Sequence, residues 1–507
     1  MTVNAARLRR SAIFGLAIVA IYGAGAVALR IRTGHTDIPV LGYATVFGFA
    51  YALYAVGIVL IYRASRVINF AHAAFGVVAA ALFYELVSYV GFPYWVALPA
   101  SIAAAAVLAM LAELLLIRRF FTAPRLVVTV VTIGIGQLLS AVAGDVPSLL
   151  GDSHFQPGQP TTPLTHFHWQ AFPVVFTGDD LLLVVASVAA FIGLAVFFRT
   201  SRKGVAVRGA AENADRASLL GVNTRSLSTL VWALSGALAG LAAVLQVPIV
   251  GYNSASAGAS VGTGPLLLAL LAAVVAGMDD LPTAVVASVA VAVFQQVVFF
   301  IFHNTDAVDL FVLVAIVVTF LLKRKSLSRV DDASTSSWAA TEEVRPIPAE
   351  LASLPVVRTG VRRLAVALGI VVLGFPFVMS TSQTSLGSSF LIDGIVVISL
   401  VVLTGWGGQV SLGQWAFVAV GAVIGGGLYA ETHMPFLLAL LIGSLAGSAV
   451  AVVLGFTALR VRGVYLAVTT LAFCRGHVHP GAQQQVHGRA HRPQHQPPVL
   501  PVHPHQR

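Results

Sequence analysis

RTSRKGVAVRGAAENADRASLLGVNTR, residues 199–225, is the polar stretch around which this apolar chain is arranged. It separates two apolar segments, roughly residues 181–198 and 229–249, each long enough to cross or nearly cross a bilayer as a helix of about 20 residues. Short loops rich in lysine and arginine stay on the cytoplasmic side of a membrane. The stretch therefore predicts a cytoplasmic loop of a membrane protein, with basic residues at Arg199, Arg202, Lys203, Arg208, Arg216 and Arg225.

A short helix is predicted inside this loop. Residues 210–220, AAENADRASLL, contain strong helix formers and few helix breakers, and they are followed by Gly221. Glycine is common just beyond a helix C-terminus because it adopts the left-handed conformation that ends many helices. We therefore expect one helix, from Ala210 to Leu220, lying across the cytoplasmic face.

The composition of the whole chain indicates a protein embedded in a lipid bilayer. Of its 507 residues, 58% are apolar and 10% are charged, far from the average of soluble domains. The net charge of +10 does not indicate a nucleic-acid partner, because the basic residues cluster in short segments between apolar runs. The single cysteine, Cys474, excludes an internal disulfide framework and a metal cluster built on cysteines.

The apolar runs predict an all-α polytopic transmembrane bundle, with about ten helices followed by about five. With an uncleaved first helix and the N-terminus inside, the basic segments fall inside and the loop 145–180 falls outside. That region agrees with the charge rule, since it has no lysine or arginine between Leu126 and Phe198. The runs cover residues 12–29, 43–61, 67–84, 94–117, 127–144, 181–198, 229–249, 265–277, 283–302 and 310–322, then 364–379, 390–404, 412–430, 437–458 and 463–473.

Composition divides the chain into two membrane modules, residues 1–322 and 364–473, joined by a polar segment. Residues 323–363 are rich in serine, threonine, proline and charges of both signs, which predicts a cytoplasmic linker. Residues 474–507 hold seven of the 14 histidines and no acidic residue. A metal-binding histidine tail is one interpretation. The irregular histidine spacing and the prolines favour another hypothesis, a frameshift near residue 474.

A repeat connects the two modules. Residues 68–75, INFAHAAF, align with residues 410–417, VSLGQWAF. Each copy is predicted to begin a helix at the inner side with a small polar residue of the N-capping type, Asn69 or Ser411. The paired positions His72 and Gln414 follow in the two copies, and we expect His72 to make a structural hydrogen bond.

The sequence does not indicate an enzyme. No residues have the spacing of a catalytic triad or a dinuclear metal site, and Glu113 is expected to pair with Arg118 or Arg119 near a helix end. An ion-coupled secondary transporter of small apolar solutes is the alternative, because the short run 265–277 resembles a broken helix and is followed by Asp279 and Asp280. These aspartates fall at the inner surface in the predicted topology, where a solvated loop is expected.

Longer motifs resemble a known family. The stretch RGAAENADRASLLGVNTRSLSTLVWALSGALAGLAAVL resembles the coupling loop of ABC-transporter permeases for branched-chain amino acids. The matching positions are Glu212, Ala217, Leu220, Gly221 and Asn223. AYALYAVGIVLIYRASRVINFAHAAFGVVAA makes the first module resemble the LivH-type permease, although Met278, Asp279 and Asp280 replace most of a glycine-rich turn of that family. GWGGQVSLGQWAFVAVGA and LGFTALRVRGVYLAVTTLAF make the second module resemble part of the LivM-type partner.

The resemblance implies a permease subunit of an importer in the inner, or plasma, membrane. It implies that the coupling helix docks on separate subunits that bind and hydrolyse ATP, and that a solute-binding protein delivers the substrate outside. No cofactor is implied in this chain, and the sequence contains no G-x-x-x-x-G-K-[ST] nucleotide-binding motif. The substrate is expected to be a branched-chain or similar amino acid, with urea and short amides left open. If the second module is truncated at residue 474, a non-functional permease is the further alternative.

Overall fold

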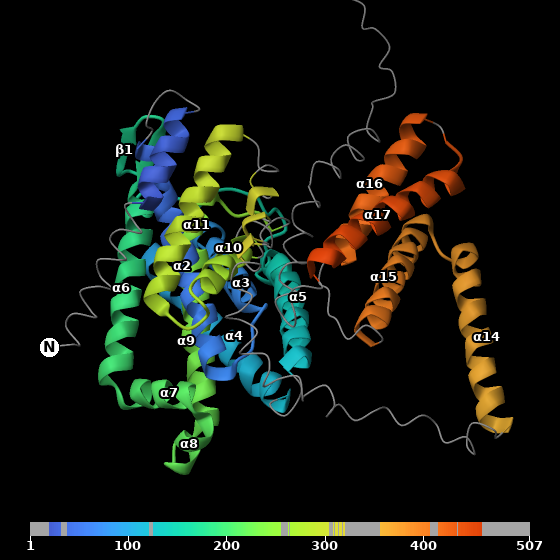
Figure 1. Cartoon of the computed structure of the whole chain (residues 1–507), viewed down its shortest axis with the longest axis horizontal. Helices are drawn as coiled ribbons and strands as arrows, with labels where there is room; N and C mark the ends of the chain where they lie inside the picture. Colours follow the sequence, from blue (N-terminus) through green and yellow to red (C-terminus); the bar gives the residue numbers. More distant parts are fainter. Residues whose placement is uncertain are drawn as a thin grey trace, which may run out of the picture.

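The computed structural model describes residues 20–31, 38–120, 125–254, 262, 264–303, 308, 310–312, 314–316, 318–319, 355–405, 414–432 and 434–458. Within these residues the chain is almost entirely helical, and eight helices are long and apolar enough to cross a membrane (Figure 1). The prediction of an all-α polytopic membrane protein is confirmed. The predicted run 463–473 and the tail 474–507 lie outside the described residues.

The first module follows the predicted order of apolar runs. A helix over Ala20–Ile31 precedes the labelled elements. These are α2 (Ile38–Ser65), α3 (His72–Ser88), α4 (Tyr94–Leu115), the 3-10 helix η1 (Ile117–Phe120), α5 (Arg125–Leu149), α6 (Gly178–Thr200), α7 (Arg202–Glu212), α8 (Ala214–Leu219), α9 (Thr224–Val250), α10 (Gly264–Val275) and α11 (Leu281–Phe302). The strands β1 (His168–Ala171) and β2 (Val174–Thr177) form an antiparallel hairpin between α5 and α6.

Helix α2 lies at the centre of this module. It is apolar on all faces, and it packs against α9, α10 and α11. As a result, 83% of its most apolar 18-residue stretch is buried. A helix that is hydrophobic all round is stable only when neighbours cover it. By contrast, only 17% of the most apolar 18-residue stretch of α6 is buried, which leaves α6 at the surface of the module.

Small residues bring α9 and α4 close together. A Cβ atom built on Gly236 would lie 2.6 Å from the carbonyl oxygen of Ala105, and one on Gly240 would lie 2.7 Å from the Cβ of Ala105. Glycine therefore allows backbone contact where any larger side chain would collide. The close approach of α9 and α4 therefore depends on both glycines.

The two ends of the first module carry different charges. The hairpin β1–β2 lies at the opposite end from α7 and α8 (Figure 1). Near the hairpin, Asp180 accepts the backbone N–H of Thr177 at 2.7 Å and forms a capping box at the start of α6. The basic residues of α7 mark the other end. This separation agrees with an acidic outer face and a basic cytoplasmic face.

The second group of helices is α14 (Pro355–Val378), α15 (Thr381–Gly405), α16 (Gln414–Thr432) and α17 (Phe436–Ala458). Helix α14 begins at Pro355, inside the segment predicted as a linker, because residues 355–363 continue the helical pattern of the apolar run. Helices α16 and α17 pack closely at Gly421 and Gly443. Ala416 of α16 is fully buried in the main hydrophobic cluster of the first module.

Candidate functional site

Helix α7 begins the predicted cytoplasmic segment. The chain turns at Ser201 after α6, and the Ser201 hydroxyl accepts the backbone N–H of Gly204 at 2.8 Å, which caps α7. Helix α7 then runs across the end of α6 (Figure 1). Val207 is buried, whereas Arg208 next to it is exposed. Helix α7 is therefore an amphipathic surface helix, as the basic sequence predicts.

The prediction of one helix from Ala210 to Leu220 is wrong. Glu212 ends α7, and Asn213 is extended with φ −155° and ψ 102° before α8 begins. The Asn213 side-chain oxygen accepts the backbone N–H of Arg216 at 2.9 Å. Asparagine favours such a cap over the interior of a helix, because its side chain competes for backbone hydrogen bonds. Asn213 therefore divides the segment into two short helices.

Gly221 ends α8 as expected. Its φ is +83°, its N–H donates to the carbonyl of Ser218 at 3.0 Å, and the N–H of Val222 donates to the carbonyl of Ala217 at 3.1 Å. This pair of bonds is the Schellman arrangement. Asn223 follows as the N-cap of α9 and accepts the backbone N–H of Ser226 at 3.2 Å. The turn between α8 and α9 is therefore fixed by hydrogen bonds.

The structure brings most of the predicted coupling residues into this turn. Ala217 is buried, and Leu220, Gly221 and Asn223 follow it within one tight connection, while Glu212 lies apart on α7. Leu219 and Leu220 are 86% and 84% exposed. Leu219 was not singled out from the sequence. The signal that points to it is a pair of adjacent leucines at the end of a polar helix.

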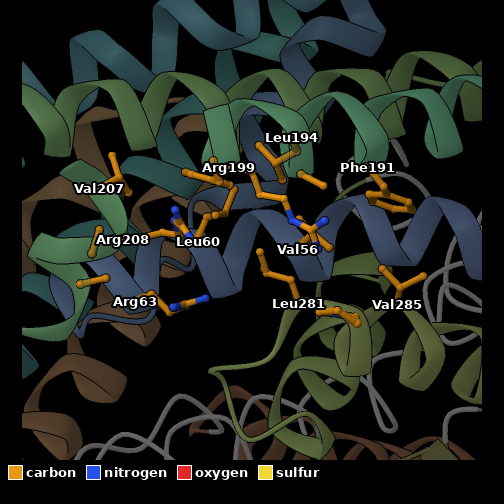
Figure 2. Close-up of a pocket in the computed structure, with 15 residues that line it drawn as sticks. Val56, Leu60, Arg63, Phe191, Leu194, Arg199, Val207, Arg208, Leu281 and Val285 are labelled. Carbon is orange, nitrogen blue, oxygen red and sulfur yellow. The ribbon is translucent and has the colours of Figure 1, made fainter. Parts of the chain in front are cut away.

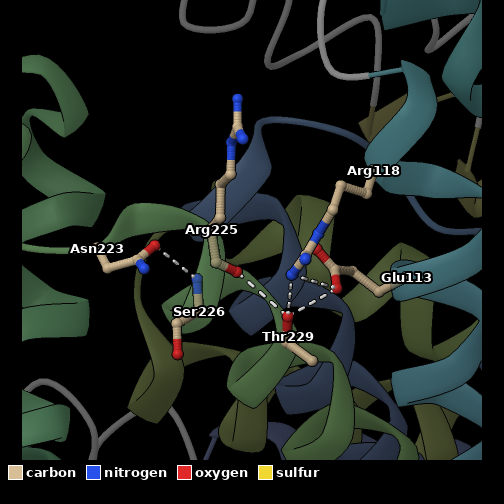
Figure 3. A network of polar contacts seen from close by, with 6 residues as sticks. All are labelled: Glu113, Arg118, Asn223, Arg225, Ser226 and Thr229. Carbon is tan, nitrogen blue, oxygen red and sulfur yellow. Dashed lines mark hydrogen bonds and ion pairs between the residues drawn. The ribbon is translucent and has the colours of Figure 1, made fainter.

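A partly buried polar network holds the first turns of α9 against α4 (Figure 3). The hydroxyl of Thr229 donates to Glu113 at 2.7 Å, and Arg118 donates to the same hydroxyl at 2.9 Å. Arg118 also lies 3.6 Å from the carboxylate of Glu113, which is fully buried. The predicted pairing of Glu113 with Arg118 is confirmed. Thr229 was missed, because a threonine in an apolar helix gives no sequence signal of its partner.

The segment before α3 differs from the prediction. Helix α3 begins at His72, so Asn69 is not its N-cap, and residues 67–71 form a buried non-helical stretch. Asn69 accepts the backbone N–H of Ala71 at 2.9 Å, and Thr132 accepts that of Phe70 at 3.1 Å. Irregular backbone is tolerated at membrane depth only when its polar groups find such partners. Two side chains therefore supply the partners that a helix would have provided.

His72 makes the structural hydrogen bond expected of it. Its Nδ1 lies 3.0 Å from the hydroxyl of Ser235, which donates to the carbonyl of Gly57 at 3.0 Å. The network joins α3, α9 and α2. In the second copy of the repeat, Ser411 lies outside the described residues, and Gln414, aligned with His72, is the first residue of α16. The repeat itself stays a prediction.

The turn after α10 lacks most of the glycine-rich pattern of the LivH-type family, and it is held by a buried side chain, a helix cap and an ion pair. Met278 is fully buried with φ +61°, and Asp280 caps α11 by accepting the backbone N–H of Thr283 at 3.3 Å. Asp279 is exposed and lies 3.5 Å from Arg66. Helix α10 has only 12 residues and is buried along almost its whole length. The two aspartates therefore stabilise a solvated turn beside a short helix.

Within the residues that the structure describes, no group of three or more histidine, cysteine, aspartate or glutamate side chains could hold a metal ion. The histidine-rich tail lies outside these residues.

Comparisons with known proteins agree with these features. A family model described as "Branched-chain amino acid transport system / permease component" matches residues 40–321. The permease protein LivH of the high-affinity branched-chain amino acid transport system of Escherichia coli K12 is 28% identical over 263 residues, covering 47% of this chain and 78% of LivH. No solved structure matches the chain significantly.

Shorter matches extend to other permeases. LivM of Escherichia coli K12 is 34% identical over 108 residues, 21% of this chain and 25% of LivM. BraD of Pseudomonas aeruginosa is 32% identical over 111 residues, 22% of this chain and 35% of BraD. The family match covers more than half of the chain, and it includes the spans of the first module. The chain is therefore a multi-pass membrane protein of the plasma membrane, and it belongs to the family of permease components of branched-chain amino acid transport systems.

Proposed function

We propose that this chain forms part of the membrane passage of an importer driven by ATP, in which separate subunits bind and hydrolyse the ATP. The substrate class is branched-chain or similar apolar amino acids, and the support for it is the family model and the names of the relatives. The chain itself needs no cofactor and no catalytic centre for this role, because the permease supplies a path and the ATPases supply the energy.

We further propose that α8 and the turn after it dock on the ATPase. The observation that carries this proposal is the exposure of Leu219 and Leu220, at 86% and 84%, on a six-residue helix beyond the inner ends of α6 and α9. Adjacent exposed leucines on a polar segment fit a protein groove, where their burial stabilises the contact. Glu212 and Asn223 border this surface, and Gly221 sets its shape.

The connections of α8 explain how a movement of the ATPase would reach the membrane. Helix α7 is capped by Ser201 at the end of α6, and α8 is joined to α9 through Gly221 and Asn223. The network around Thr229 then joins α9 to α4. Because each connection is fixed by hydrogen bonds, a displacement of α8 moves the inner ends of α6 and α9 together.

The domain organisation is proposed in the same terms. Residues 1–322 form a LivH-type module, residues 323–363 connect it to the second module, and residues 364–473 correspond to part of a LivM-type module. Fusing the two through a linker raises the effective concentration of each for the other. A solute-binding protein would approach the opposite end of the molecule, where the hairpin β1–β2 lies.

A double substitution tests the docking surface. We expect Leu219→Asp with Leu220→Asp to weaken binding of the cognate ATPase subunits by at least about tenfold, because the proposed contact would then bury two carboxylates in place of two leucines. Binding would be measured by co-purification and by titration in detergent, and leucine uptake would be measured in proteoliposomes.

The matched control is Val175→Asp on β2, which adds a carboxylate at a half-exposed position at the other end of the molecule. Its binding of the ATPase should equal that of the wild type. Wild-type affinity in the double variant would rule out α8 as the docking element.

A further inference from the structure

A second site lies at the cytoplasmic end, apart from the exposed leucines of α8. The inner parts of α2, α6, α7 and α11 enclose a pocket of about 480 Å³ (Figure 2). Val56, Leu60, Leu194 and Phe198 form much of its wall. This volume is in the range of pockets that hold small ligands, and the wall fits an aliphatic chain.

Three arginines line the same pocket. Arg63 comes from the last turn of α2, Arg199 from the end of α6, and Arg208 from α7 (Figure 2). In the described part of the chain, none of the three has an ion pair with a carboxylate. The aspartates that precede Leu281 in the pocket wall are engaged elsewhere, since Asp279 pairs with Arg66 and Asp280 caps α11. The pocket therefore carries uncompensated positive charge.

The apolar and basic parts of the pocket follow one another along α2 and α6. Going back from Arg63 to Val56 along α2 covers roughly 10 Å, and going back from Arg199 to Phe191 along α6 covers roughly 12 Å. The arginines thus lie at the cytoplasmic boundary, and the apolar wall extends from them towards the membrane centre. Ile192, which follows Phe191 of the wall, is 60% exposed.

We propose that this pocket binds an anionic glycerophospholipid of the cytoplasmic leaflet. The phosphate lies among Arg63, Arg199 and Arg208, and one acyl chain follows the wall formed by α2 and α6. Guanidinium groups bind phosphate oxygens through paired hydrogen bonds, and basic pockets between transmembrane helices on the cytoplasmic side recognise such headgroups. A zwitterionic lipid fits less well, because its ammonium group would approach three cations.

Native mass spectrometry of the full chain tests this assignment. The chain would be titrated in detergent with dioleoylphosphatidylglycerol, with dioleoylphosphatidylcholine, or with glycerol phosphate. We expect one phosphatidylglycerol to be retained per chain, at least about tenfold more tightly than phosphatidylcholine, because the arginines favour net negative charge. Glycerol phosphate should not be retained, since it lacks the acyl chain. This comparison uses the wild-type chain and does not depend on the folding of a variant.

Two variants distinguish the contribution of the arginines to lipid binding from that of the apolar wall. Substituting Arg63→Gln, Arg199→Gln and Arg208→Gln together should weaken retention of phosphatidylglycerol by at least about tenfold. Leu194→Trp should weaken it too, because a bulkier ring fills the cavity while all charges remain.

The matched control removes three basic residues that do not line the pocket, by Arg119→Gln, Arg202→Gln and Lys203→Gln. Its retention should stay within about twofold of the wild type, since none of the three charges that are lost lines the pocket. Equal retention of phosphatidylglycerol and phosphatidylcholine would overturn the proposal. So would equal losses in the triple variant and this control, or retention of glycerol phosphate as tight as that of the lipid.

Discussion

Gly221 determines the direction in which the chain leaves α8. Its φ of +83° lies in the left-handed region, and beyond its two chain neighbours no atom lies within 4 Å of a Cβ built on it. A side chain at this position would therefore meet no steric neighbour, and the whole cost of a substitution would come from the backbone conformation. That cost is about 1–2 kcal/mol for an ordinary residue, and it is larger for β-branched residues.

We predict that Gly221→Val uncouples ATP hydrolysis from uptake without unfolding the membrane helices. Valine disfavours the left-handed conformation, so α8 would leave its position relative to α9. The ratio of leucine transported to ATP hydrolysed would be measured with the cognate ATPases in proteoliposomes, and we expect it to fall several-fold.

Gly221→Asn is the control for that variant, because asparagine tolerates the left-handed region better than other residues with a side chain. We expect its coupling ratio to stay near the wild-type value. A valine variant with normal coupling would show that the turn does not control transmission.

Single residues also explain where prediction from the sequence stopped. The role of Gly221 as the residue that ends a helix was predicted correctly, because a glycine directly after a helical run usually adopts the left-handed conformation that ends the helix. Asn213 was not recognised as a cap, because its neighbours on both sides are helix formers and the break depends on one side-chain bond to Arg216. Leu219 was missed because the exposure of a side chain depends on the fold. The sequence alone did not distinguish Leu219 from the adjacent Leu220.

At the scale of the elements, the contact of α9 with α4 depends on glycine. A Cβ atom on Gly236 would lie 2.6 Å from the carbonyl oxygen of Ala105, and that oxygen belongs to the rigid backbone of α4. The helices would have to separate to admit a larger residue. The same pair of helices is joined by the Thr229 network nearer the cytoplasm.

We predict that Gly236→Val destabilises the first module by about 1–3 kcal/mol, because overpacking forces the two backbones apart. The midpoint of thermal unfolding in detergent, followed by loss of the monodisperse peak in size-exclusion chromatography, should fall by several degrees. The same change at Gly134 of α5 is the control, since a Cβ there meets nothing within 4 Å. Equal midpoints for both variants would contradict the close approach of α9 and α4.

The extent of the helices could be predicted, whereas breaks within them could not. Apolar runs gave the number and order of the helices in the described part, because lipid requires long apolar helices. The start of α3 was placed too early, since residues 67–71 are as apolar as a helix. Their non-helical path depends on bonds to Thr132, more than 60 residues away in the sequence, and no local pattern contains that information.

At the scale of the whole molecule, the source of energy distinguishes the proposed importer from a secondary transporter. The buried histidine His72 and the buried Glu113 each have protein partners, Ser235 and Arg118, that hold them in place. Neither is needed as a carrier of protons or sodium in the proposed mechanism, in which the movement of α8 opens the path.

We therefore predict that leucine uptake into proteoliposomes, with the cognate ATPases and binding protein present, requires ATP. Uptake should persist when a protonophore and sodium-free buffers abolish ion gradients, because no ion is coupled to transport. Radiolabelled leucine would be counted over the first minute. Uptake driven by a proton or sodium gradient without ATP would favour the ion-coupled alternative.

The absence of lysine and arginine between Leu126 and Phe198 has a consequence for how the protein can evolve. Asp145, Asp152, Asp179 and Asp180 have little influence on which way the neighbouring helices insert, since orientation follows basic residues. The outer loop can therefore accept new acidic or neutral residues without reversing the insertion of the chain. A new lysine there would compete with the cytoplasmic arginines when the chain inserts into the membrane. Substitutions that add negative charge to this loop are therefore tolerated more readily than substitutions that add positive charge.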